Sequence, residues 1–262
     1  MSIEKPSPNS AVILGYHAIS AGSPPAWQSR EQAFYTVEAQ EFQAHLNLVQ
    51  QLGCRVCLPE EFLASSGNQS KSLLLTFDDG HESDFTVTLR ALQQRNLRAT
   101  FFVCLDYIGR PGYMDWPQVK ALSAAGMSVQ SHGLLHRDLT QFCEDDVFHE
   151  LRSARLCLER NLQCPVRYLA LPGGFASLHV YQAAARAGYG AIFNSDASLA
   201  CRGNILRRFI IRRGTTVRDL EKIILGSKTS LLSAALRRKT SECLKAVVGV
   251  QRYESLKMRL WS

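Results

Sequence analysis

Two adjacent carboxylates follow a short apolar run near residue 75. The run Leu73–Phe77 (LLLTF) is typical of a buried strand, and Asp78, Asp79 and Gly80 come directly after it. Successive side chains of a strand point in different directions, so we expect the two acids to have different tasks. Asp-Gly is also common turn chemistry, and Asp79 could simply cap the next helix. The pair therefore needs support from a second group of reactive residues.

A second group follows another expected strand, residues 127–131 (MSVQS). His132 and His136 are four residues apart, and two imidazoles at this spacing on one helical turn can bind one metal ion. A lone pair of histidines at this spacing also arises by chance. Together with one aspartate from the other strand end, the two histidines make a set of three ligands that leaves positions open for water and substrate. Such a set is typical of a catalytic metal site.

The elements that must position these residues are apolar strands alternating with amphipathic helices. We expect strands at 11–16, 54–58, 72–77, 99–104, 127–131, 166–171, 190–193 and about 205–211. Continuous apolar strands separated by helical patterns indicate a parallel sheet that is covered on both faces. The number and spacing of these units predict an α/β fold, a distorted (β/α) barrel of about seven strands. Reactive groups of such folds gather at the C-terminal ends of the strands, where both groups above are found.

Composition and charge divide the chain unequally. Of its 262 residues, 46% are hydrophobic and 20% are charged, which is ample for one large core. Residues 1–201 carry 15 basic and 19 acidic residues, whereas residues 202–262 carry 15 basic and 4 acidic ones. We therefore expect a barrel over 1–226 and a basic amphipathic helical extension over 227–262. The extension could lie on an anionic membrane surface or dock on the barrel. The distribution argues against a nucleic-acid-binding protein.

The cellular location is predicted from the N-terminal residues, the length of the apolar runs and the cysteines. The polar N-terminal residues do not resemble a signal peptide, and no apolar run approaches the roughly 18 to 20 residues that span a bilayer. The eight cysteines are then expected to be reduced, with Cys54 and Cys57 as ordinary thiols rather than a metal or redox pair. These features predict a cytoplasmic protein, peripheral on the inner membrane face if the extension binds lipid.

The two groups of reactive residues resemble signature motifs of the polysaccharide deacetylase family, carbohydrate esterase family four. Thr76–Gly80 (TFDDG) and Ser131–His136 (SHGLLH) are similar to its first two motifs, and Arg137–Thr140 (RDLT) continues the second. Three further segments match at similar spacing: Leu14–His17 (LGYH), Ala99–Phe102 (ATFF) and Met114–Trp116 (MDW). The resemblance covers about residues 11 to 215.

This resemblance implies a role for each reactive residue. Asp79, His132 and His136 would hold a divalent metal, with zinc expected and cobalt, nickel or iron also compatible with these ligands. Asp78 would be the general base. The reaction implied is hydrolysis of an N-acetyl group from an amino sugar, in an N-acetylated glycan or a lipid-linked sugar precursor. The backbone N–H of Gly173 would help to stabilise the oxyanion.

Trp116 is a candidate for contact with the sugar. Aromatic faces suit pyranose rings, so its indole could form a wall of the substrate site. Trp116 also opens a helical pattern just before Pro117 and could equally be a packing residue.

Two features of the family pattern are missing. The arginine that usually orients the base is replaced by Ala170 in the run Leu169–Gly174 (LALPGG). The late Leu-x-His motif that usually supplies a general acid does not follow residue 190, because the last histidine of the chain is His179. Some deacetylases of poly-N-acetylglucosamine share both absences and the Tyr-His start, so the resemblance implies this branch. An inactive sugar-binding barrel is the alternative. A metal-free glycoside hydrolase is disfavoured, because adjacent acids do not readily flank a glycosidic bond at about 5 Å or more.

The general acid must then come from another histidine. Two of the seven are assigned to the metal, while His45 and His149 lie in helical patterns and are expected on the surface. His81 could line the cleft or lie on an exposed loop. His17 directly follows the strand 11–16, so it should emerge at the same rim as Asp78. We predict that His17 is the general acid, with a residue that merely caps the strand as the alternative.

Overall fold

The computed structural model describes residues 11–22, 29–65, 72–195 and 204–226, and the predicted extension at 227–262 lies outside them. The strands are β1 (Val12–Tyr16), β2 (Ile19–Ser20), β3 (Val37–Glu38), β4 (Arg55–Val56), β5 (Ser72–Asp79), β6 (Thr100–Val103), β7 (Ser128–Ser131), β8 (Tyr168–Ala170), β9 (Ala191–Asn194), β10 (Ile205–Arg207) and β11 (Phe209–Ile210). The α-helices are α1 (Arg30–Tyr35), α2 (Ala39–Gln51), α3 (Pro59–Ala64), α4 (Leu89–Gln93), α5 (Trp116–Ala124), α6 (Glu144–Leu162), α7 (Leu178–Arg186) and α8 (Val217–Ile224). Four single turns are η1 (Asp84–Thr88), η2 (Leu105–Tyr107), η3 (Leu139–Gln141) and η4 (Pro172–Gly174).

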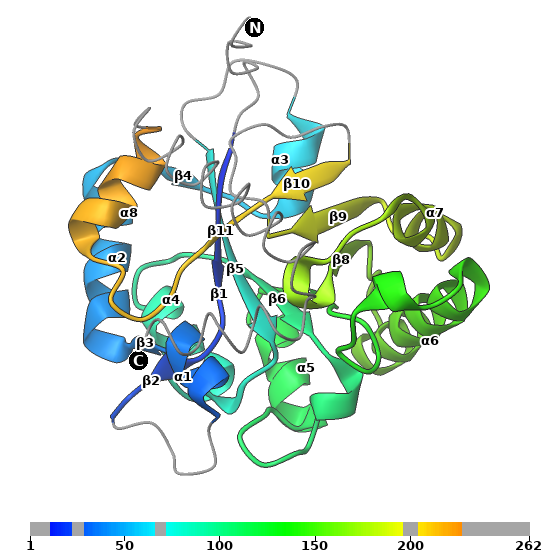
Figure 1. Cartoon of the computed structure of the whole chain (residues 1–262). Coiled ribbons are helices and arrows are strands. Elements are labelled where there is room, and N and C mark those ends of the chain that lie inside the picture. The colour runs from blue at the N-terminus through cyan, green and yellow to red at the C-terminus, as the bar shows by residue number, and fades with distance from the viewer. Residues whose placement is uncertain (1–10, 23–28, 66–71, 196–203, 227–262) are drawn as a thin grey trace, which may run out of the picture.

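The main sheet is parallel and bent into a nearly closed barrel (Figure 1). Its strand order is β10-β9-β8-β7-β6-β5-β1-β11, with the short β4 paired to β5. The two outer strands, β10 and β11, are consecutive in the chain and separated only by Arg208. One segment therefore pairs with β9 on one side and with β1 on the other. This confirms the predicted (β/α) barrel, and the strand expected at about 205–211 is the segment that brings its two edges together.

Alternating side chains of the strands face two different cores. On β5, Leu73, Leu75 and Phe77 belong to the cluster between sheet and helices. Leu74 belongs to a second cluster that fills the barrel together with Ile13 and Phe102. Because the side-chain period of a strand is two, positions 74, 76 and 78 share the inner face. Strand β5 thus directs the carboxylate of residue 78 into the barrel interior, at the C-terminal ends of the strands.

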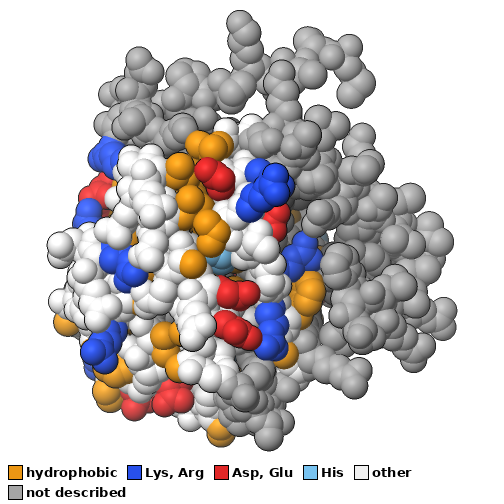
Figure 2. All heavy atoms as spheres, turned by 90° about the vertical axis from the view of Figure 1, so that its left-hand side faces the viewer, with side chains coloured by type: hydrophobic (Ala, Val, Ile, Leu, Met, Phe, Trp, Pro, Cys, Tyr) orange, Lys and Arg blue, Asp and Glu red, His pale blue; other side chains and the backbone are white. Residues whose placement is uncertain are grey.

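Helices surround this barrel (Figure 1). Helices α2 and α8 lie together on one side, and α6 packs against α7 on the other. Figure 2 views the side of α2 and α8, where basic and acidic side chains are interspersed with hydrophobic ones. On α8 itself, Arg218 and Lys222 alternate with Asp219 and Glu221. The visible part of this face therefore carries charges of both signs.

His45 on α2 corrects one expectation. It was expected on the surface but is buried, with only 1% of the residue exposed, because α8 packs on α2. Its Nε2 lies 2.8 Å from the carbonyl oxygen of Thr215, and its Nδ1 lies 3.3 Å from the hydroxyl of Tyr16. Burial lowers the pKa of His45, so the ring is neutral and satisfied on both sides. His149, on α6, is exposed as expected.

Membrane spans and disulfides can be assessed only for the described residues. None of the helices in these ranges is long and apolar enough to cross a membrane. No disulfide joins the six cysteines that these ranges contain, Cys54 and Cys57 among them.

Candidate metal centre and base

Asp79, His132 and His136 converge at the C-terminal ends of β5 and β7. Their ligand atoms all lie within 4.8 Å of one another. Oδ1 of Asp79 is 3.3 Å from Nε2 of His132 and 3.1 Å from Nε2 of His136. Asp79 has a φ of 76°, in the left-handed region, so its carboxylate leaves the direction set by the strand. The two sequence motifs therefore meet in space as predicted.

The donor chemistry of this cluster fits a divalent cation. Nδ1 of His132 lies 2.9 Å from the carbonyl oxygen of Ala170, so this nitrogen carries the proton and donates it. The other nitrogen, Nε2, then presents a lone pair to Asp79, whose buried Oδ1 receives no hydrogen bond of good geometry. Lone pairs that face one another without a shared proton are stable when a cation lies between them. The three residues can hold zinc or a similar ion.

Charge on Asp79 is favoured by its neighbours. Burial by itself would raise the pKa of Asp79, but the imidazoles of His132, His136 and His81, when they carry a proton on the nitrogen that faces it, outweigh burial and hold that pKa well below its usual range. The carboxylate is thus ionised at neutral pH and available as a metal ligand.

Asp78 is held by a buried arginine that the sequence analysis did not identify. The guanidinium of Arg208 forms two parallel bonds to it, from Nη1 to Oδ1 at 2.6 Å and from Nη2 to Oδ2 at 2.8 Å. Nη1 also lies 3.3 Å from the hydroxyl of Thr76. Burial would raise the pKa of Asp78, but the charge and the hydrogen bonds of the Arg208 guanidinium lower it overall. Asp78 is therefore ionised, oriented and suited to accept a proton.

Arg208 reaches this position because of where the barrel closes. It lies between β10 and β11, and its side chain points into the barrel with only 1% exposed. Gly15 of β1 leaves room for Ile210 of the paired strand β11, because a Cβ at position 15 would lie 2.7 Å from Cδ1 of Ile210, while it would make only ordinary contact with Cδ of Arg208 at 3.8 Å. The arginine missing at Ala170 is thus supplied by a different strand. The adjacent Arg207 and Arg208 within the otherwise apolar run Ile205–Ile211 were the only signal in the sequence.

Two more histidines lie at the same rim. His17 follows β1 and stacks on Tyr35, with ring centroids 4.8 Å apart. Its Nδ1 is buried without a hydrogen-bond partner. Burial lowers the pKa of His17, although the charges of Asp79 and Asp78 act in the opposite direction. His81 is 3% exposed, and its Nε2 lies 3.5 Å from Oδ2 of Asp79. It therefore lines the site and does not lie on an exposed loop.

Aromatic rings flank the histidines. Tyr113 stacks on His81 at 4.8 Å and Tyr107 stacks on His136 at 5.4 Å, and the two tyrosines lie 4.5 Å apart. Both are partly exposed, so they form an aromatic wall beside the metal centre. Trp116 instead packs, partly buried, against the hydrophobic clusters on both sides of α5. Its contact with a sugar stays a prediction.

Gly173 lies in the turn after β8. Its φ of 64° is left-handed, and a Cβ at this position would lie 2.5 Å from the ring of Phe175. Only glycine fits there without displacing the ring. The turn follows Ala170, whose carbonyl orients His132, so Gly173 is close in the chain to the metal centre. Its role as an oxyanion donor remains a prediction.

Comparisons with known proteins agree with this site. Residues 65–192 match the family model described as polysaccharide deacetylase. A chitooligosaccharide deacetylase of Sinorhizobium fredii is 33% identical over 132 residues, which are 48% of this chain and 58% of the relative. A peptidoglycan-N-acetylmuramic acid deacetylase of Bacillus subtilis is 31% identical over 137 residues, 49% of this chain and 48% of the relative. The solved structure of the Streptococcus pyogenes deacetylase PplD in complex with acetate is 26% identical, with a TM-score of 0.74 over 83% of this chain and 99% of that one.

The barrel and these matches define a domain of the polysaccharide deacetylase type. The chain belongs to the polysaccharide deacetylase family. It spans only about half the length of the two curated relatives described above.

Replacement of any one ligand should empty the metal site. We expect Asp79→Ala, His132→Ala and His136→Ala each to lose bound zinc, because two remaining protein ligands hold the ion weakly. Metal content of the purified proteins after exposure to zinc measures this, with His149→Ala on the exposed face of α6 as control. Full occupancy in all three ligand variants would contradict the assignment.

Replacement of Arg208 should change the pH profile of the base. Arg208 keeps the pKa of Asp78 low, so Arg208→Met should raise that pKa and shift the acidic limb of kcat/KM to higher pH. Arg208→Lys keeps one charge and should shift it less. Circular dichroism checks folding, and Arg213→Met, which removes an exposed pair with Glu38, serves as control. A lower rate with an unmoved acidic limb in both Arg208 variants would show that the arginine does not set the charge of the base.

Proposed function

We propose that this protein is a metal-dependent hydrolase that removes N-acetyl groups from amino sugars of a polysaccharide or its lipid-linked precursor. The observation that carries the proposal is the convergence of Asp79, His132 and His136 beside a carboxylate, Asp78, that Arg208 holds ionised. Family membership supports the reaction class, and the two curated relatives are named for deacetylation of N-acetylated sugars. The missing third-motif arginine and the Tyr-His start favour poly-N-acetylglucosamine as the kind of glycan.

The chain supplies the base for attack by water. A bound divalent cation, with zinc expected, would polarise the amide carbonyl and lower the pKa of a water molecule. Asp78 accepts the proton of the attacking water, and Arg208 keeps both of its oxygens in place while this occurs. The backbone N–H of Gly173 would donate to the oxygen that becomes negative.

The chain must also protonate the departing nitrogen. When the carbon–nitrogen bond breaks, one water has been consumed, acetate leaves and the amine takes up a proton. His17 lies on the inner face of the rim that also carries Asp78, and we assign it the role of general acid. Burial lowers the pKa of His17, so its ring starts neutral and must gain a proton before it can donate one.

A sugar would rest on the aromatic wall. Tyr107 and Tyr113 stand beside His136 and His81 and are only partly buried, so their faces can contact a pyranose ring. Gln32 donates a hydrogen bond to the hydroxyl of Tyr113 at 2.9 Å, which limits rotation of that ring.

An inactive sugar-binding barrel is the second candidate, and no specific observation favours it. Its main argument was the arginine missing at Ala170, and Arg208 now fills that role. For the location we propose the cytoplasm, and a peripheral position on the inner membrane face if the extension at 227–262 binds lipid. The membrane part of this proposal rests on the eight basic and two acidic residues of 227–262, which lie outside the described part of the chain.

Acetate release tests the proposed function. Zinc-loaded protein should release acetate from β-1,6-linked N-acetylglucosamine oligomers, lose this activity with a chelator and regain it with zinc. Asp78→Asn should keep its zinc and lose about 10² to 10⁴ in rate, because the base is gone while the ligands remain. Asp145→Asn, an exposed acid of α6, is the control. Absence of acetate release from every N-acetylated glycan in a panel would contradict the proposal in favour of the inactive barrel.

The leaving group tests the general acid. His17→Ala should bind zinc normally and lose about 10² to 10⁴ in rate on the amide, the usual size of a general acid–base contribution. The loss should be smaller on an acetyl ester with a good leaving group, which needs little protonation. His149→Ala is the control. Equal losses on amide and activated ester would assign His17 another task.

A further inference from the structure

The turn that carries both metal-binding histidines is conformationally unfavourable. Between His132 and His136 the chain passes through left-handed backbone at Gly133, with a φ of 80°, and again at His136 itself, with a φ of 47°. Glycine adopts this region freely, but for a residue with a Cβ it is unfavourable. The position of the His136 ring therefore depends on contacts that hold the turn.

The first half of the turn is held by the neighbouring strand and its loop. The backbone N–H of His132 donates to the carbonyl of Val103 at 2.9 Å. The carbonyl of Leu134 accepts from the N–H of Asp106 at 2.9 Å. These bonds continue the pairing of β6 and β7 and end before His136.

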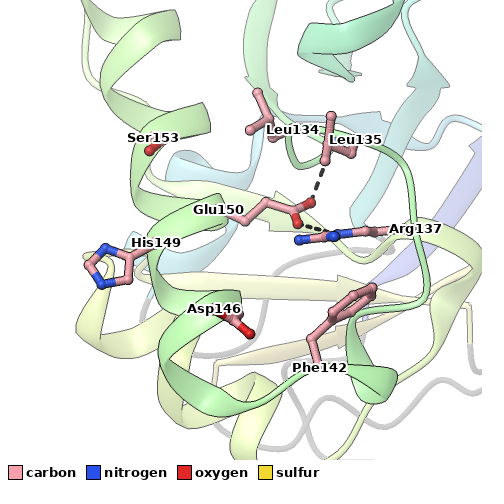
Figure 3. A pocket seen from close by; sticks show the side chains of 8 residues that line it. All are labelled: Leu134, Leu135, Arg137, Phe142, Asp146, His149, Glu150 and Ser153. Atoms are coloured by element: carbon pink, nitrogen blue, oxygen red, sulfur yellow. Dashed lines mark hydrogen bonds and ion pairs between the residues drawn. The ribbon is translucent and has the colours of Figure 1, made fainter.

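The second half is held by one buried carboxylate on α6. Oε1 of Glu150 lies 3.4 Å from the N–H of Leu135, and Oε2 accepts from Nε of Arg137 at 2.5 Å. Figure 3 shows both contacts of Glu150. Leu135 and Arg137 are the residues directly before and directly after His136 in the sequence. The side chain of Glu150 is only 3% exposed, and the guanidinium of Arg137 lies 3.8 Å from the ring centroid of Phe142.

Glu150 and its two contacts lie outside the set of candidate metal ligands. The groove of about 490 Å³ beside α6 is lined by Leu134, Leu135, Arg137, Phe142, Asp146, His149, Glu150 and Ser153 (Figure 3). Neither oxygen of Glu150 belongs to the ligand cluster of Asp79, His132 and His136. Any effect of Glu150 on the metal must therefore pass through the backbone of the turn.

We propose that Glu150 is a positioning residue for the metal centre, which fixes His136 by holding the residues on either side of it. A buried carboxylate bound to a backbone N–H and to an arginine is rigid, since moving it would leave charges unpaired in the interior. The left-handed conformation of His136 is maintained by these two contacts. The inference rests on the metal site of the proposed function but not on the identity of the substrate.

The same helix offers a matched control. Glu159 is also on α6, and its Oε1 accepts from the N–H of Val166 at 3.1 Å and from Nη1 of Arg155 at 2.9 Å. It thus joins a backbone N–H and an arginine as Glu150 does, but at the end of α6 that leads toward β8. A loss of general stability should follow from changes at either glutamate, whereas a change in metal affinity should follow only at Glu150.

Zinc affinity of the full chain tests the proposal. We expect Glu150→Ala to weaken zinc binding about 10- to 100-fold, the range found when groups that orient metal ligands are removed. Glu150→Gln keeps an oxygen for Leu135 and should lose less. Glu159→Ala should bind zinc as the unaltered chain does. Competition with a chromophoric chelator gives the dissociation constants, and the visible spectrum of the cobalt-loaded protein reports the geometry of the ligands.

Three outcomes would overturn the inference: no zinc binding by the unaltered chain, affinity within twofold of it in both Glu150 variants, or equal weakening in Glu159→Ala. If Glu150→Ala does not fold, the zinc affinity of Glu150→Gln alone tests the proposal. The assay contains no substrate. Weaker zinc binding without any acetate release from the unaltered chain would therefore support the role of Glu150 while contradicting the proposed function.

Discussion

The buried ion pair between Asp78 and Arg208 is the interaction on which the site depends. Both side chains are almost completely excluded from water, with 4% and 1% exposed. Removing one partner of such a pair typically costs about 3 to 5 kcal/mol, because the other charge is left unpaired. Arg208 also stands at the junction of β10 and β11, where the sheet closes. The residue that keeps Asp78 ionised is thus held at the junction where the barrel closes.

This pair also explains how two neighbouring carboxylates take different tasks. Two adjacent anions in a buried site would repel each other, and one of them would take up a proton. Here Asp78 faces the guanidinium inside the barrel, whereas Asp79 turns through left-handed backbone toward His132 and His136. The guanidinium of Arg208 stabilises the anion of Asp78, and the candidate metal site accommodates the anion of Asp79, so both carboxylates remain ionised. In the proposed mechanism, this change of backbone conformation between two consecutive residues would separate proton transfer from metal binding.

The origin of the arginine matters less than its position. In the family pattern that this sequence resembles, the arginine comes from the third motif, where this chain has Ala170. The guanidinium needs only to reach Asp78 from some strand end at the same rim, and a barrel brings all of its strand ends to that rim. Ala170 still contributes through its carbonyl, which orients His132. The absence of one motif residue is therefore a poor indication of an inactive protein.

The sequence by itself determined the barrel and the reactive strand ends, because both are local patterns. An apolar run followed by Asp78 and Asp79 already predicts a buried strand that ends in a site, and the histidines that follow the expected strand 127–131 indicate a second strand end of this kind. The partners of these residues were decided only by the tertiary structure. Arg208 is 130 positions from Asp78, and the burial of His45 depends on α8 packing on α2. Periodicity shows which side of an element is apolar. Which charged or polar groups meet across the interior follows from how the sheet closes and which helices cover it.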